Sequence, residues 1–175
     1  MKDGKVKAIG ASNLNAERLA QALAVSDAQH LPRYATLQPH YNLVERASFE
    51  GPLQDLCVRE GIGVITYFSL ASGFLTGKYR SDADLGKSTR GGGMAKHLNP
   101  RGHAILAALD RTSARLSATP AQVALAWLMT RPSVVAPIAS ATNVAQLREL
   151  MAATELTLDA KALAELDEAS SPQSQ

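Results

Sequence analysis

The chain is poor in cysteine and in long apolar runs, and each shortage excludes a class of protein. Its 175 residues include one cysteine, Cys57, so no disulfide can form within the chain and a reducing compartment is expected. No stretch reaches the ~20 apolar residues that a membrane-spanning helix requires. Residues 1–13 contain no apolar run of the kind found in secretory signal peptides. These absences predict a cytoplasmic protein without a membrane partner.

An excess of charge of one sign is also missing. The 18 lysines and arginines nearly balance 16 acidic residues, and no basic stripe alternates with aromatic residues, so nucleic acid is not expected as a partner. Histidines, cysteines and carboxylates do not occur at metal-ligand spacings, which predicts no metal site. Hydrophobic residues make up 46% of the chain and charged residues 19%, a composition typical of a globular domain.

What is present is an alternation of short apolar strands with amphipathic helices. Strands are expected at VKAIG (6–10), YATLQ (34–38), IGVITYF (62–68) and VVAPI (134–138). The helices between and after them begin with capping residues, which are Asn15, Thr119, Asn143 and Asp159. Apolar stripes predict the buried faces of the first two helices: Leu19, Leu23 and Val25, then Phe49, Leu53, Leu56, Cys57 and Val58. Repeated strand–helix units favour a parallel sheet.

The repeat count and one missing motif narrow the fold. No G-x-G-x-x-G follows the first strand, which counts against the doubly wound dinucleotide fold and favours a β/α barrel. The chain has four strand–helix units where a barrel needs eight. We therefore predict an α/β fold, half of a (β/α)8 barrel with an extra C-terminal helix, as one domain over 1–175. Residues 70–100 lack periodicity and are expected to form a long functional loop, and 171–175 a polar tail.

Polar and aromatic side chains follow the expected strands. Ser12-Asn13, then Gln38, then Tyr67 come at the carboxyl ends of the first three, and the fourth runs into a capped helix. Amides and hydroxyls can hydrogen-bond a carboxamide, an aromatic face can stack on a flat heterocycle, and a helix amino end favours phosphate. This combination predicts a nicotinamide nucleotide lying across the mouth of the barrel.

Six motifs in a fixed order carry a resemblance to a known family. They are GASN (10–13), LQPHYN (37–42), TYFSLASGFLTGKY (66–79), NPRG (99–102), TPAQVALAWLM (119–129) and PIASATNVAQLREL (137–150). Over residues 4–170 the chain resembles the carboxyl-terminal half of the aldo-keto reductases, NADP(H)-dependent (β/α)8 oxidoreductases. The resemblance implies the last four βα units of that barrel.

The resemblance also implies which residues bind NADP(H). At the nicotinamide, Ser12, Asn13 and Gln38 would hydrogen-bond the carboxamide and Tyr67 would stack on the ring. The residues implied around the pyrophosphate and ribose are Phe68, Ser69, Leu70, Ser72, Gly73, Lys78, Tyr79 and Arg90. Those implied at the adenosine end are Ser140, Thr142, Gln146 and Glu149, with Leu150 where the family often has Asn.

The family's catalytic tetrad of Asp, Tyr, Lys and His lies upstream of anything that matches Met1. No catalytic residue is therefore assigned, and two functions stay open. One is the cofactor-binding half of an enzyme that reduces small aldehydes or ketones when completed by an N-terminal half. The other is a catalytically inactive, truncated remnant that acts as a nucleotide-binding or interaction protein. In either case the open barrel edges predict self-association.

Overall fold

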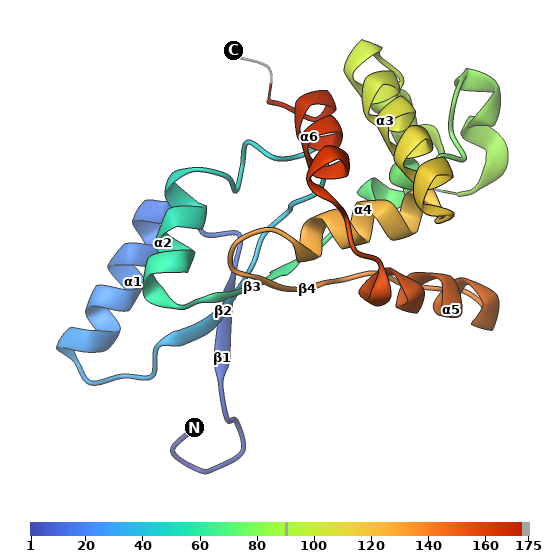
Figure 1. The fold of residues 1–175 in the computed structure, drawn as a ribbon. Coiled ribbons are helices and arrows are strands. Elements are labelled where there is room, and N and C mark those ends of the chain that lie inside the picture. Colours follow the sequence, from blue (N-terminus) through green and yellow to red (C-terminus); the bar gives the residue numbers. More distant parts are fainter. Residues whose placement is uncertain (90, 173–175) are drawn as a thin grey trace.

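The computed structural model describes residues 1–89 and 91–172. The strands are β1 (Ile9–Ser12), β2 (Tyr34–Gln38), β3 (Gly63–Thr66) and β4 (Val134–Pro137). The α-helices are α1 (Ala16–Ala28), α2 (Pro52–Glu60), α3 (Pro100–Leu116), α4 (Pro120–Met129), α5 (Val144–Ala152) and α6 (Ala160–Ala169). Short 3-10 helices are η1 (Ala71–Thr76), η2 (Asp82–Lys87), η3 (Gly91–His97) and η4 (Ala153–Glu155). Figure 1 shows the strands between α1 and α2 on the left and α3 to α6 on the right.

The four strands form one parallel sheet in the order β1-β2-β3-β4. Sequential order with parallel pairing requires a helical crossover between neighbours, as the alternating pattern predicts. The predicted α/β class with four strand–helix units is therefore confirmed.

One face of the sheet is covered by helices. Ala11, Leu37 and Val64 lie side by side in the register of β1, β2 and β3, and all three are buried. Leu19 and Leu23 of α1 belong to the same hydrophobic core. Cys57 is buried in this core too, as its place in an apolar stripe predicts.

The opposite face of the sheet is largely uncovered. Ser12 and Gln38 are exposed, and Val135 is 65% exposed. Side chains alternate between faces along a strand, so these residues point away from the helical layer. A Cβ at Gly10 would lie 2.3 Å from Thr36 Oγ1, so only glycine fits there. In a closed barrel this face would form the interior.

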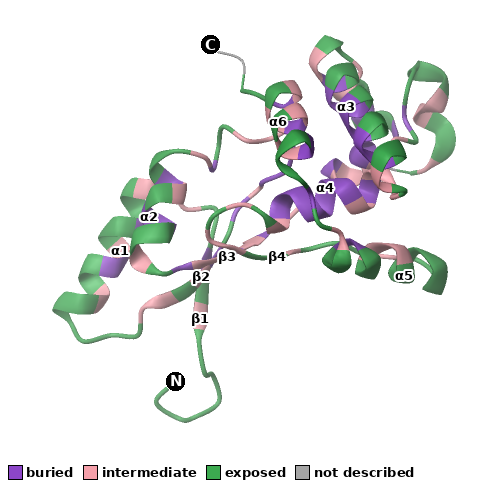
Figure 2. Ribbon diagram, in the orientation of Figure 1, coloured by how far each residue is buried: buried purple, intermediate pink, exposed green. Residues whose placement is uncertain are grey.

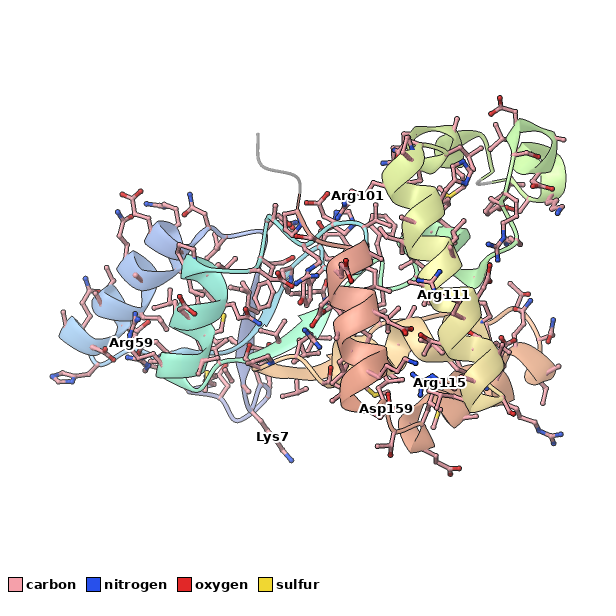
Figure 3. All side chains as sticks on the ribbon, turned by 45° about the horizontal axis from the view of Figure 1, so that its top comes forward. Lys7, Arg59, Arg101, Arg111, Arg115 and Asp159 are labelled. Atoms are coloured by element: carbon pink, nitrogen blue, oxygen red, sulfur yellow. The ribbon has the colours of Figure 1, made fainter. Side chains whose placement is uncertain are left out.

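A second packed region lies beyond β4. Trp127 of α4 is fully buried, and its indole N–H donates to Asp167 Oδ1 of α6 (2.8 Å). Arg115 of α3 pairs with Asp159 at the start of α6 (2.6 Å), as Figure 3 shows. In Figure 2 the buried residues concentrate in α4, whereas α5 has no buried residue.

The predicted helix boundaries are confirmed by their caps. The side chains of Asn15, Asn143 and Asp159 each accept a hydrogen bond from a backbone N–H in the first helical turn. Thr119 forms a capping box with Gln122, and Gly61 ends α2 in a left-handed conformation. Each cap satisfies a backbone group that would otherwise lack a partner.

Several predictions need correction. Residues 70–100 are not one irregular loop, because three 3-10 helices and the start of α3 occupy them. Val25 and Val58 are not buried: they are 49% and 53% exposed. The first strand begins at Ile9 rather than Val6. In the predicted tail, 173–175 lie outside the described residues.

Candidate cofactor site

The carboxyl ends of β1, β2 and β3 bring the predicted nicotinamide residues together. The Tyr67 hydroxyl donates to Asn13 Oδ1 (2.9 Å), which links the end of β3 to the end of β1. The Ser12 hydroxyl donates to the backbone carbonyl of Gln38 (2.9 Å). Asn13 has a φ of 56°, in the left-handed region that asparagine tolerates better than most residues. This local backbone turn directs the amide toward Tyr67.

The ring of Tyr67 is already covered on one face. His40 stacks on it with ring centroids 5.3 Å apart and planes 19° apart, and Phe68 contacts it edge-on at 5.3 Å. The Tyr67 N–H donates to the Pro39 carbonyl (3.0 Å), which fixes the backbone beneath the ring. Tyr67 is thus half-buried rather than freely exposed. A flat heterocycle that stacks on it has the face opposite His40.

Asn42, which is not among the predicted cofactor residues, holds the turns beside this cluster together. It is buried, its amide nitrogen donates to the Phe68 carbonyl (2.9 Å), and its Oδ1 accepts from the N–H groups of Val44 (2.8 Å) and Glu45 (2.9 Å). The side chain therefore joins the turn after β2 to the turn after β3. The signal in the sequence was the Asn within LQPHYN, a residue type that favours turns.

The loop after β3 has an unusual backbone and two internal hydroxyls. Phe68 has a φ of 52°, Ser72 of 55° and Gly73 of 101°, all in the left-handed region. The buried Ser69 hydroxyl donates to the Thr66 carbonyl (3.1 Å). The hydroxyl of buried Tyr79 shares a 2.6 Å hydrogen bond with that of Ser88. Ser69 and Tyr79 therefore hold the loop together with their side chains.

Other predicted loop residues are at least partly accessible, and Phe68 is 51% exposed. Lys78 is exposed, and its ammonium group lies 5.1 Å from the centroid of the Tyr79 ring. Leu70 is half-buried against the core. The predicted cofactor residue Arg90 lies outside the described residues.

The predicted adenosine end lies where β4 leads into α5. Gln146 Oε1 accepts from both the N–H and the hydroxyl of Thr142 (2.9 Å each), while Thr142, Gln146 and Ser140 are all exposed. The side-chain carbonyl oxygen of Gln146 is thus engaged with Thr142, and its amide nitrogen is the group of this exposed side chain that could donate to a ligand. Glu149 differs, because its carboxylate accepts from the Thr119 hydroxyl of α4 (2.7 Å). Its side chain is directed to the body of the protein.

A cavity of about 450 Å³ adjoins the nicotinamide end. His40, Phe68 and Ser72 line it from the strand ends, and Lys96 and His97 line it from η3. Burial lowers the pKa of His40 and of His97 below the usual value, and the nearby positive charge of Lys96 acts in the same direction. His97 is half-buried, and its ring centroid lies 5.1 Å from that of Phe74. Its sequence spacing gave no signal of this position.

Two other kinds of site are absent from the part of the chain that the structure describes. No three His, Cys, Asp or Glu side chains within residues 1–89 and 91–172 lie close enough together to hold a metal ion. No helix in those ranges has the length and apolar character needed to cross a membrane.

Polar groups at strand ends, next to a capped helix amino end, are the arrangement expected of a nucleotide-binding barrel mouth. The family model described as "Aldo/keto reductase family" matches residues 1–171. This chain belongs to the aldo/keto reductase family. Members of the family generally use NADH or NADPH.

Several curated aldo/keto reductase relatives are similar over nearly the whole chain. It is 32% identical to Protein tas of Escherichia coli (strain K12), over 94% of this chain and 48% of that protein. It is 30% identical to the NADH-specific methylglyoxal reductase of the same strain, over 95% and 50%. It is 32% identical to a probable voltage-gated potassium channel subunit beta of Arabidopsis thaliana, over 84% and 46%. The chain thus spans about half the length of the curated relatives it matches.

The donor set of this aldo/keto reductase chain fits a nicotinamide nucleotide at both ends. At the nicotinamide end, Gln38 and Asn13 supply amide groups, and the Tyr67 ring has the face opposite His40 for stacking. At the adenosine end, Gln146 supplies an amide near the amino end of α5. Ser69, Tyr79 and Glu149 fit less well, because their polar groups are occupied within the protein. They shape the site through packing.

Proposed function

We propose that the chain carries the cofactor-binding, carboxyl-terminal half of an NADP(H)-dependent aldo-keto reductase that reduces aldehydes or ketones when complete. The observation that carries the proposal is the hydrogen bond between the Tyr67 hydroxyl and Asn13 Oδ1, which joins two predicted nicotinamide residues across the strand ends. A reduced nicotinamide, when bound, supplies the hydride for carbonyl reduction. The chain's own residues bind and orient it.

Each group of residues has a defined task in this proposal. Asn13 and Gln38 hydrogen-bond the carboxamide, and the free face of Tyr67 stacks on the ring while His40 supports the other face. The left-handed turn at Ser72 and Gly73 lets the loop approach the pyrophosphate closely, and the exposed Lys78 neutralises its charge.

The adenosine end completes the site in this proposal. Thr142 and Gln146 face the adenosine ribose and its 2′-phosphate at the amino end of α5, where the helix dipole favours an anion. Position 146, which faces the 2′-phosphate in this proposal, holds glutamine rather than arginine, and one relative is named as NADH-specific, so NADH is tested beside NADPH.

A second candidate function is a non-catalytic nucleotide-binding or interaction protein. It is favoured by the similarity to proteins named as potassium channel beta subunits, of Arabidopsis thaliana and of Schizosaccharomyces pombe. In addition, the Tyr67 hydroxyl donates to the Asn13 amide oxygen and is therefore engaged within the protein.

Calorimetric titration of the purified chain with NADPH and with NADH tests the proposal. We expect saturable binding, retained by Tyr67→Phe, which keeps the ring and loses only the hydroxyl. Tyr67→Ala should weaken binding about tenfold, because it removes the stacking surface, which is worth about 0.5–1.5 kcal/mol in aromatic pairs beyond area burial. Equal affinities of the two variants, or no binding by the folded wild-type chain, would refute the proposed role of Tyr67.

A further inference from the structure

The imidazole of His40 forms the back of the proposed nicotinamide platform. The backbones of His40 and Tyr67 pair in an isolated parallel bridge beyond the ends of β2 and β3, so the two side chains leave the sheet on the same face. Their rings stack with centroids 5.3 Å apart and planes 19° apart. Phe68 contacts His40 edge-on at 5.4 Å. A charge on His40 would therefore act directly on the π-electrons of Tyr67.

The hydrogen bonds of Asn42 define the protonation state of His40. Asn42 Oδ1 accepts from the N–H groups of Val44 and Glu45. Its Nδ2 donates to the Phe68 carbonyl (2.9 Å), and these three bonds fix which end of the amide is the nitrogen. The same Nδ2 lies 3.3 Å from His40 Nε2. Because an amide nitrogen only donates, His40 Nε2 accepts and carries no proton, so the imidazole is neutral.

The surroundings of His40 favour the same neutral form. Burial is the main influence and lowers the pKa of His40 below its usual value. Two charged groups face the ring with opposite effects on that pKa: Glu45, in the turn after β2, raises it, and Lys96 of η3 lowers it. Both line the cavity of about 450 Å³ beside His40, together with His97. Hydrogen bonding and burial thus agree on an uncharged ring at neutral pH.

We propose that neutral His40 lets Tyr67 bind the oxidised as well as the reduced nicotinamide, and that a proton on His40 selects against the oxidised form. The inference rests on the proposed function, in which the face of Tyr67 opposite His40 stacks on the nicotinamide ring. The oxidised ring is a cation, whereas the reduced ring is uncharged. An aromatic face attracts a cation, and an imidazolium on the other face competes for the same π-electrons and repels the bound cation.

The size of the effect follows from the thickness of the stack. The 5.3 Å between His40 and Tyr67, followed by about 4.5–5 Å to a stacked ring, separates the two positive charges by about 10 Å. With an effective dielectric constant of about 20–40, their repulsion weakens binding about four- to sixteenfold. The uncharged reduced ring does not experience this repulsion. His40 is therefore a specificity-determining residue for the oxidation state of the cofactor.

The ratio of the NADP⁺ to the NADPH dissociation constant isolates this effect, because the rest of the nucleotide is the same in both ligands. Calorimetric titration of the wild-type chain should give a constant ratio above about pH 6.5 and a rising ratio below it, since His40 gains its proton there. His40→Arg adds a permanent charge on a planar group that can still stack on Tyr67, and should raise the ratio about four- to sixteenfold at pH 7.5. His40→Gln adds no charge and should keep the ratio constant between pH 7.5 and 6.0.

His97→Arg is the matched control, because it places the same charge in the same cavity. The ring of His97 packs beside Phe74, with centroids 5.1 Å apart, so a charge there should change the ratio by less than about twofold. A second measurement needs no cofactor. Nitrogen-15 NMR of the imidazole, assigned by its loss in His40→Gln, should show a proton on Nδ1 and none on Nε2 at pH 7.5. Circular dichroism establishes that each variant is folded.

The two levels of inference fail in different ways. If the folded chain binds both cofactor forms, and the ratio is the same in the wild type, His40→Arg and His40→Gln, His40 does not select the oxidation state and the proposed function is unaffected. A proton on Nε2 at pH 7.5 would also contradict the assignment of His40. If the folded wild-type chain binds neither NADP⁺ nor NADPH, the proposed function is wrong and the role of His40 is wrong with it.

Discussion

The two ends of the proposed cofactor site are built in different ways. At the nicotinamide end, Tyr67 is held by a hydrogen bond to Asn13, by stacking on His40 and by a backbone bond to Pro39. At the adenosine end, Thr142 lies just before α5 and bonds to Gln146 of that helix, which has no buried residue. The first end is fixed by three strands and the core, and the second by local bonds alone.

This difference predicts a division of labour in binding. Groups that the protein already holds in place lose little freedom when a ligand binds, so they select geometry efficiently. Exposed groups near a helix amino end attract charge but must be ordered on binding. The nicotinamide end should therefore control orientation, and the adenosine end should contribute affinity that depends strongly on single side chains.

The largest expected difference from a complete reductase is the absence of catalysis, although the nicotinamide end is well ordered. We expect the purified chain to show no NADPH-dependent reduction of simple aldehydes, because the Tyr67 hydroxyl donates to Asn13 and, in the proposed function, the chain supplies only the cofactor-binding half. Loss of NADPH absorbance with a panel of aldehydes is the assay. Turnover that survives stringent purification and disappears in Tyr67→Phe would give that hydroxyl a catalytic role.

The next effect compares one asparagine from each end for stability. Asn42→Ala should lower the free energy of unfolding by about 2 kcal/mol, because it removes three part-buried hydrogen bonds, to Val44, Glu45 and Phe68. Asn143→Ala removes an exposed helix cap and should cost about 1 kcal/mol. Denaturant unfolding measures both. Equal costs would mean that the two ends are anchored alike.

Substitution of exposed cofactor residues should weaken NADPH binding more than it lowers the free energy of unfolding. Lys78→Ala and Gln146→Ala should each weaken NADPH binding by about 1 kcal/mol, roughly fivefold, since each removes one hydrogen bond to the ligand. Both side chains are exposed, so stability should change little. Arg148→Ala, on the same helix as Gln146, is the comparison for a general loss of positive charge. Unchanged NADPH affinity in Lys78→Ala and Gln146→Ala would mean that neither side chain contacts the cofactor.

The smallest effect concerns pH. Burial lowers the pKa of His40 in the folded chain, so the unfolded chain takes up the proton at higher pH. The free energy of unfolding should therefore be fully retained above about pH 6.5 and decline as the pH falls below it. His40→Gln should flatten this decline, and His97→Gln should do so as well because burial also lowers its pKa. The free energy of unfolding of the wild-type chain and of each variant is measured between pH 7.5 and 5.5. The same decline in all three proteins would mean that neither histidine causes it.

Local rules predicted much of the fold from the sequence. Helix starts at Asn15, Thr119, Asn143 and Asp159 depend on bonds within a single turn, so residue type alone identifies them. Parallel strand order followed from the alternation of strands and helices. Val25 and Val58 were placed wrongly because helical periodicity does not say where the covering layer ends.

The site was harder to predict because its contacts join distant segments. The support of Asn42 for Phe68, the cover of His40 on Tyr67 and the burial of the Tyr79 hydroxyl beside Ser88 depend on how loops pack. No sequence spacing encodes these contacts. Similarly, Lys96 and His97 of η3 line the same cavity as residues at the strand ends. The sequence of η3 has no periodic pattern that predicts this position.

An NMR titration of the isotope-labelled chain with NADPH distinguishes one cofactor site that spans both ends from two separate sites. We expect saturable shifts with a single dissociation constant in the amides of Asn13, Gln38 and Tyr67 and in those of Thr142 and Gln146. The amides of α2, on the helical side of the sheet, should stay unchanged. Shifts confined to one end, or different dissociation constants at the two ends, would contradict a single nucleotide spanning the strand ends.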